Sequence, residues 1–292
     1  MTLSGRSYSA DNLSIRYGFA RRMARSTCYM KFALVNGERR EAQPKLVGEC
    51  PRCGSEMIAK CGDVYAHHWA HKGRRKCDLW WENETEWHRA WKNQFPLDWQ
   101  EVVYRAEDGE KHIADVRTED GWFIEFQHSR IKPEERDSRE EFYKKLIWVI
   151  DGTLRPTYEE QFLKALDYAE APIIQLPSLG RFRQMKGRLL DQWANRMVHV
   201  LLDFGAAGPL WWLLPLQGIH GRWITRIRKE DFIQALGPVE HREDKRFGVT
   251  ADNYIAMLKE FESMERRADN ARSRAIDPLA IPRPRPRPRG RR

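Results

Sequence analysis

Two short pairs of metal-binding residues lie close together in the first third of the chain. Cys50 and Cys53 form a C-x-x-C knuckle, and His68 and His71 form an H-x-x-H pair, with fourteen residues between the pairs. Zinc prefers four nitrogen and sulfur ligands in a tetrahedron, and two short-spaced pairs supply them at little cost in loop closure. We therefore expect these four residues to bind a structural zinc ion, with no coordination position left for water.

Three neighbouring residues compete with these ligands: His67, Cys61 and Cys77. Cys77 in particular could replace one of the histidines. A redox C-x-x-C is the alternative, but it requires a thioredoxin-like βαβ context, which this part of the sequence lacks. The chain has five cysteines, an odd number, and arginines interrupt every apolar stretch of its first thirty residues. These features argue against a disulfide framework and favour a cytoplasmic protein.

A second group of reactive side chains lies on a predicted helix over residues 83–95. Glu84, His88 and Lys92 are spaced by four residues, so they lie along one face of that helix. An acid, an imidazole and an amine on one face are compatible with a metal site. They are equally compatible with a solvated face, because a Glu and a Lys on such a face also stabilise a helix.

Two further carboxylates lie on the strands predicted over residues 111–118 and 122–129. A three-residue turn ending at Gly121 would place Asp115 opposite Glu125, on the same face of the hairpin. Two carboxylates so close repel each other unless one is protonated or a cation lies between them. Mg²⁺ or Mn²⁺ with oxygen ligands is the natural occupant. A two-residue Asp-Gly turn would instead shift the register by one and separate the pair.

This order of features resembles the competence protein CoiA-like family, within the PD-(D/E)XK nuclease superfamily. The resemblance covers residues 28–152 and rests on motifs that occur in the family's order: the Cys50–Cys53 knuckle, the His68–His71 pair, Glu84 with His88 and Lys92, Ala114-Asp115-Val116, Glu125-Phe126-Gln127-His128-Ser129, Arg139 with Tyr143, and Trp148-Val149-Ile150.

The resemblance implies that Glu84, Asp115 and Glu125 bind a catalytic Mg²⁺ or Mn²⁺. Gln127 stands where most of the superfamily has lysine, and an amide cannot stabilise developing negative charge as a cation can. Gln127 could still orient the attacking water, and His88 or Lys92 could supply the missing charge. Tyr143 could reach the scissile phosphate or the metal-site carboxylates; it could equally fill the core.

The sequence predicts an α+β fold: a PD-(D/E)XK-like mixed sheet flanked by helices, preceded by a small zinc module and followed by a strand-rich accessory region. We expect a basic arm over 1–27, a zinc-finger-like module over 28–82, a nuclease core over 83–156, an accessory region over 157–275 and a Pro-Arg tail over 276–292. The expected strands are 28–35, 100–106, 111–118, 122–129, 146–151, 196–204, 209–216 and 222–228, and the expected helices are 83–95, 133–145, 157–170, 229–236 and 250–274.

The charge distribution indicates a polyanionic partner. Residues 282–292 hold six arginines and no acid, which is two thirds of the formal net charge of +9. The leading hypothesis is a metal-dependent deoxyribonuclease in DNA processing or recombination, with DNA as substrate and recombination or DNA-uptake proteins as implied partners. One alternative is a catalytically inactive, zinc-containing nucleic-acid-binding protein. Another is an adaptor that binds proteins through the Pro-Arg tail. No apolar run approaches the length of a membrane span.

Overall fold

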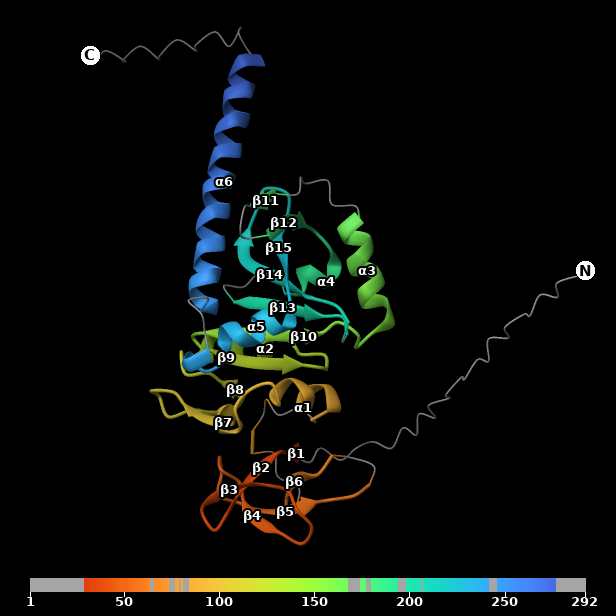
Figure 1. Ribbon diagram of the computed structural model, residues 1–292, viewed down its shortest axis with the longest axis vertical. Helices are drawn as coiled ribbons and strands as arrows, with labels where there is room; N and C mark the ends of the chain where they lie inside the picture. Colours follow the sequence, from red (N-terminus) through yellow and green to blue (C-terminus); the bar gives the residue numbers. More distant parts are fainter. Residues whose placement is uncertain are drawn as a thin grey trace, which may run out of the picture.

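The computed structural model contains two β-sheets, one at the N-terminal end and a larger one that extends through the rest of the chain (Figure 1). The structure describes residues 29–63, 66–73, 77–78, 80, 84–167, 174–176, 180–193, 198–205, 207–241 and 246–276. The basic arm predicted over 1–27 and nearly all of the predicted tail lie outside these residues. Within them, no helix has both the length and the hydropathy to cross a bilayer.

The N-terminal sheet has six strands in the order β1-β6-β5-β4-β2-β3, and all neighbours are antiparallel. The turn between β2 and β3 is Asn36-Gly37, and both residues have positive φ (53° and 80°), as a tight hairpin requires. The strands are β1 (Tyr29–Met30), β2 (Phe32–Val35), β3 (Glu38–Glu41), β4 (Val47–Glu49), β5 (Glu56–Lys60) and β6 (His68–His71).

A small core holds this sheet together. Met30, Ala33, Met57 and Trp69 are each fully buried in it. The indole nitrogen of Trp69 donates to the carbonyl oxygen of Arg40 at 2.9 Å, so the polar group of this buried ring has a hydrogen-bond partner. The predicted zinc-finger-like module is therefore a small β-sheet domain.

The larger sheet has nine strands in the order β11-β12-β15-β14-β13-β10-β9-β8-β7. It is mixed, because β10 runs parallel to both β9 and β13 and the other pairs are antiparallel. The strands are β7 (Gln100–Arg105), β8 (Lys111–Arg117), β9 (Phe123–Gln127), β10 (Leu146–Asp151), β11 (Ile174–Leu176), β12 (Gly180–Met185), β13 (His199–Asp203), β14 (Leu210–Gln217) and β15 (Arg222–Ile227).

Helices cover both faces of this sheet. One face packs against α1, α5 and α6 through residues such as Trp91, Phe232 and Phe247. The other packs against α2, α3 and α4 and includes Phe162 and Leu189. The helices are α1 (Glu86–Lys92), α2 (Pro133–Phe142), α3 (Pro156–Asp167), α4 (Arg188–Asp191), α5 (Lys229–Leu236) and α6 (Phe247–Ile276), with short 3₁₀ turns η1 (Leu97–Trp99) and η2 (Val239–His241).

The central strand β10 is buried along its whole length, as its uninterrupted apolar sequence predicts. β13 lies beyond the predicted boundary at residue 156, yet it pairs with β10 from Ile147↔His199 to Asp151↔Asp203. The predicted nuclease core and accessory region therefore share one continuous sheet. The α+β class is confirmed, with the small module at the N-terminal end.

The first helix is shorter than the predicted 83–95. Thr85 is its N-cap, and the Thr85 hydroxyl accepts the backbone N–H of His88 at 3.2 Å. The helix ends at Lys92. Asn83, the first residue of the predicted helix, lies outside the described residues. Glu84 therefore precedes the helix instead of belonging to its first turn.

Candidate metal centre and acidic cavity

Four sulfur and nitrogen donors gather at the edge of the N-terminal sheet. One ligand atom from each of Cys50, Cys53, His71 and Cys77 lies within 4.8 Å of all the others. Cys50 follows β4, and a tight turn brings Cys53 beside it: the N–H of Gly54 donates to the carbonyl oxygen of Cys50 at 2.8 Å. Gly54 has a φ of 69°, a conformation that favours glycine.

The distances and charges inside this cluster suit a bound cation. The Sγ atoms of Cys50 and Cys77 are 3.7 Å apart, and Cys53 Sγ lies 3.4 Å from His71 Nε2. Contact with Cys77 and burial raise the pKa of the Cys50 thiol. Burial acts against ionisation of Cys53, but hydrogen bonds from Ser55 and His71 lower its pKa to about 6. Contacts with Cys50 and Cys77 raise the pKa of His71 to about 11. Three thiols and one imidazole at this spacing are a donor set that could hold a structural zinc.

The structure brings together three of the four predicted zinc ligands, and His68 lies outside the cluster. His68 and His71 are three residues apart on β6, so their side chains point to opposite faces of the strand. His68 Nδ1 instead contacts the carbonyl oxygen of Ala66 at 2.9 Å. Cys77, the alternative ligand, takes the fourth place. Neither Cys61 nor His67 belongs to the cluster.

A second constellation lines a small cavity of about 30 Å³ between α1, α2 and strands β7–β9. This volume is room for an ion or a water molecule. Five carboxylates and two fixed cations border it. The lining residues are Asp78, Trp80, Glu84, His88, Lys92, Glu101, Ile113, Asp115, Glu125, Phe126 and Arg139.

Asp115 and Glu125 face each other at this cavity. β8 pairs with β9 at Val116↔Ile124 and Arg117↔Phe123, and Thr118 N–H donates to the carbonyl oxygen of Trp122 at 2.9 Å. The register beside Asp115 and Glu125 is therefore the one that the three-residue turn predicts. The ladder ends there, because the Asp115 carboxylate accepts the N–H of Phe126 at 2.9 Å, and Glu125 Oε1 accepts the N–H of Asp115 at 3.4 Å.

Burial and the charge of Asp115 raise the pKa of Glu125 to about 8, against the opposing effect of Arg139. Arg139, on α2, binds Glu125 Oε2 through Nη1 at 2.9 Å, and its Nη2 donates to Glu135 and to the carbonyl oxygen of Trp80. A carboxyl with such a pKa is poised to exchange its proton for a metal ion.

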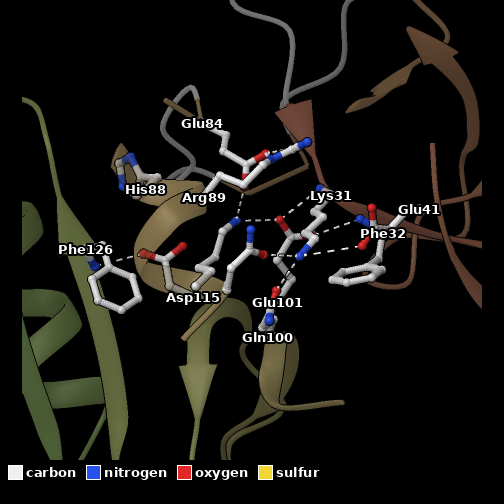
Figure 2. Close-up of polar contacts among 12 residues, drawn as sticks. Lys31, Phe32, Glu41, Glu84, His88, Arg89, Gln100, Glu101, Asp115 and Phe126 are labelled. Atoms are coloured by element: carbon white, nitrogen blue, oxygen red, sulfur yellow. Dashed lines mark hydrogen bonds and ion pairs between the residues drawn. The ribbon is translucent and has the colours of Figure 1, made fainter. Parts of the chain in front are cut away.

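A chain of buried ion pairs runs from Glu84 through Lys92 to Glu101 (Figure 2). Lys92 Nζ lies 2.6 Å from Glu84 Oε1 and 2.8 Å from Glu101 Oε1. Arg89 also pairs with Glu84. Both cations lower the pKa of Glu84 although its burial raises it. The two carboxylates in turn raise the pKa of Lys92 against the effect of its complete burial.

The same chain of charges attaches the N-terminal sheet to the larger one. The Glu101 carboxylate accepts the backbone N–H groups of Lys31 at 2.9 and 3.0 Å and of Phe32 at 3.1 Å. Lys31 Nζ donates to Asn93 Oδ1 at 2.6 Å and to Gln100 Oε1 at 2.9 Å. Figure 2 shows Lys31 beside Gln100 and Glu101. The candidate zinc module is thus held directly beside the acidic cavity.

The remaining predicted residues occupy different positions. His88 is buried and lines the cavity. Gln127 is buried on the same face of β9 as Glu125, but its amide nitrogen donates to Ser129, at 3.2 Å to O and 3.3 Å to Oγ, and it is not among the lining residues. Tyr143 is the C-cap of α2; burial and the charge of Glu125 raise its pKa well above the ordinary value.

Sequence reasoning missed Glu101 and Asp78. Glu101 has a positive φ of 46° on an expected strand, and only its long-range contacts with Lys31 and Phe32 show its role. Asp78 binds His112 Nδ1 at 2.8 Å and the N–H of Ile113 at 3.1 Å. Its position one residue after Cys77, a zinc ligand candidate, was the one available signal.

The carboxylates of the acidic cavity differ in how free they are to bind a divalent metal ion. Within the described part of the chain, the Cys/His cluster is the one group of at least three His, Cys, Asp or Glu residues whose ligand atoms all lie within 4.8 Å of one another. Asp115 and Glu125 nonetheless fit Mg²⁺ or Mn²⁺, which takes one or two carboxylates and keeps several waters. The Glu84 carboxylate is held by Lys92 and Arg89, so it reaches the cavity without being a ready ligand.

Comparison with known proteins adds one finding. Residues 47–79 match the family model of the N-terminal domain of competence protein CoiA. The match includes all four residues of the Cys/His cluster and thus confirms part of the resemblance. The similarity lies within the N-terminal module and does not extend to the larger sheet. Neither the curated proteins nor the solved structures contain a match.

Proposed function

We propose that this protein is a metal-dependent nuclease that hydrolyses phosphodiester bonds of DNA during DNA processing or recombination. The observation that carries the proposal is the opposition of Asp115 and Glu125 in an acidic cavity that also holds Lys92 and Arg139. A cavity with five carboxylates repels a phosphate unless a cation neutralises them. An acidic cavity beside two buried cations therefore suits a phosphate that arrives together with a metal ion.

A bound Mg²⁺ or Mn²⁺ would supply a Lewis acid, a water of lowered pKa and countercharge for the phosphate. Asp115 and Glu125 would hold it, with backbone N–H groups fixing both carboxylates in advance. Arg139 orients Glu125 through its 2.9 Å contact. The resemblance to PD-(D/E)XK nucleases supports these roles, since it implies an Asp on one strand and a Glu on the next.

Most of the PD-(D/E)XK superfamily has a lysine where this chain has Gln127. Lys92 is the best candidate for the cation that takes over the role of that lysine. It is fully buried, lines the cavity and keeps its proton because Glu84 and Glu101 stabilise it. Glu84 then serves to position Lys92, and His88 lies within reach of the same cavity. Gln127 is held by Ser129, which favours a role in fixing the end of β9 over one in orienting water.

The zinc module contributes position and rigidity in this proposal. Arg52, between Cys50 and Cys53, donates to the carbonyl oxygen of Lys111 at 2.8 Å and pairs with Asp78 at 3.4 Å. A zinc ion at the Cys/His cluster would fix Arg52 and hence Asp78 at the wall of the cavity. Structural zinc sites stabilise small modules in this way.

The test is a cleavage assay on circular single-stranded DNA and linear duplex DNA, with Mg²⁺, Mn²⁺ or EDTA. We expect metal-dependent cutting that the Asp115→Ala variant loses, whereas Asp108→Ala, a change in the exposed turn between β7 and β8, leaves cutting intact. Cutting that persists in EDTA, or in Asp115→Ala at the wild-type rate, would overturn the proposal. Cutting of the circle would also establish endonuclease action.

A catalytically inactive nucleic-acid-binding protein is the second candidate. The observation in its favour is that Gln127 replaces lysine and lies outside the cavity lining. DNA binding without cutting, unchanged by Asp115→Ala, would establish this alternative.

A further inference from the structure

A second, larger cavity of about 490 Å³ lies where α2 and α3 begin, at the end of β10. Its volume falls within the range of small-molecule sites. Ile150, Leu189 and Trp193 contribute an apolar floor, and arginines from four separate segments surround it. The arginines are Arg130, Arg136, Arg155 and Arg188, and the cavity that they surround is called the arginine pocket below.

Three of the four arginines in the pocket have no acidic partner in the described part of the chain. Among the described residues that line it, Asp191 is the one acid. Arg130, Arg155 and Arg188 are exposed and have no ion pair within 4.0 Å in the part of the chain that the structure describes. Four like charges around one hollow repel one another, and a bound anion removes that repulsion.

Arg136 is held more closely than the other three: its Nη1 donates to the carbonyl oxygen of Gln192, and its guanidinium lies 5.5 Å from the centre of the Trp193 ring. Its side chain is 12 % exposed, and its buried Nε has no hydrogen-bond acceptor among the described residues. The nearest acids are Asp137 at 3.6 Å and Glu140 at 3.8 Å, beyond hydrogen-bond distance. These contacts make Arg136 the fixed cation of the pocket, while the three exposed arginines are available to a ligand.

We infer that the arginine pocket binds a nucleotide phosphate. Guanidinium groups bind phosphate oxygens through charge-assisted hydrogen bonds. The same pocket offers Tyr158, which is partly exposed beside Arg155 and whose ring suits the base or sugar of the nucleotide. The chemical class of the ligand is therefore a nucleotide, either free or within a strand.

The position of the pocket connects it to the acidic cavity, and this part of the inference rests on the proposed function. Glu125 and Ser129 lie four residues apart on the segment that leads from one cavity to the other, so their Cα atoms are at most about 14 Å apart. That span corresponds to at most about four nucleotides along the axis of duplex DNA, at about 3.4 Å of rise each. A strand whose scissile phosphate lies at Asp115 and Glu125 would place a nearby nucleotide in the arginine pocket.

The test measures binding to the zinc-loaded protein in buffer without Mg²⁺ or Mn²⁺, so that no strand is cut and an inactive protein still gives an answer. The probes are a labelled single-stranded oligonucleotide and free deoxyadenosine 5′-monophosphate. The variant is Arg155→Gln with Arg188→Gln, both exposed and therefore compatible with folding. The control is Arg105→Gln with Arg181→Gln, two exposed arginines outside the pocket that remove the same charge.

We expect the pocket variant to bind the oligonucleotide at least about tenfold more weakly than the control does. The slope of log affinity against log salt should fall by about 0.7 for each phosphate that the variant no longer binds. A parallel loss of mononucleotide binding would identify a self-sufficient nucleotide site; loss for the oligonucleotide alone would assign the phosphate to a strand. The inference would be overturned if both double variants bound the oligonucleotide equally weakly, or if neither bound it more weakly than the wild type. This holds whatever the result of the cleavage assay.

Discussion

The backbone N–H of Asp115 donates to the carboxylate of Glu125, and the carboxylate of Asp115 accepts the backbone N–H of Phe126, the next residue after Glu125. The two acids are therefore cross-linked across the hairpin instead of being free to turn away from each other. A cation that binds between them would find both ligands already placed, which lowers the cost of ordering them.

This relationship predicts a pH dependence of stability. In the folded protein Glu125 keeps its proton up to a pKa of about 8, whereas an unfolded glutamate loses it near pH ~4.3. Folding therefore takes up a proton between these values, and the free energy of unfolding should fall as the pH rises through this window. Thermal unfolding of the zinc-loaded protein in Mg²⁺-free buffer from pH 5 to 9 measures it. Glu125→Gln should flatten the slope; an unchanged slope would contradict the assignment.

Lys92 should be the most costly cation to remove. Its Nζ lies between Glu84 and Glu101 in complete burial. Lys92→Met would leave two buried carboxylates without this partner and should destabilise the fold by about 3–5 kcal/mol in urea unfolding. Lys72→Met is the matched control, because Lys72 forms an exposed pair with Glu56 at 2.8 Å and should cost about 0–1 kcal/mol. Equal losses of unfolding free energy in the two variants would show that Lys92 does not stabilise the buried carboxylates as described.

The zinc content of two variants distinguishes Cys77 from His68 as the fourth zinc ligand. Cys77→Ser should lose most of the bound zinc and lower the melting temperature, because three ligands remain. His68→Ala should keep about one zinc per chain, since His68 lies outside the cluster. Colorimetric zinc release from both purified variants decides this. Retention by Cys77→Ser together with loss by His68→Ala would restore the four ligands expected from the sequence.

Glu101 should control how firmly the N-terminal sheet is attached. Its carboxylate accepts the N–H groups of Lys31 and Phe32, so Glu101→Gln weakens both bonds by removing the charge. Hydrogen exchange at these two amides should accelerate, whereas the exposed Glu107→Gln should leave them protected. Unchanged protection in Glu101→Gln would mean that other contacts hold the sheet in place.

Local patterns predicted the acid pair well, because a turn glycine and the two-residue period of strands fix a register. Gly121 has a φ of 76°, and the pairing of Val116 with Ile124 follows from its turn. The same two-residue period argues against two ligands three residues apart on one strand, as His68 and His71 are. The expected strands do not include residues 68–71, so this constraint does not enter the zinc-ligand prediction.

Other features could not be read from local patterns because distant segments create them. Glu101 becomes important only when Lys31, seventy residues earlier in the chain, docks against it. The joining of β13 to β10 depends on a parallel pairing across more than forty residues, and no turn signal encodes it. The expected division at residue 156 follows from Pro156 and from where the resemblance ends, and neither of these reports strand pairing.

The most direct test of the central claim is the binding of Mn²⁺ to the zinc-loaded protein, followed by electron paramagnetic resonance. We predict one ion per chain, with affinity that rises with pH as Glu125 loses its proton, and loss of that ion in both Asp115→Asn and Glu125→Gln. Mn²⁺ bound with wild-type affinity by either variant, or no Mn²⁺ bound by the wild type, would contradict the account.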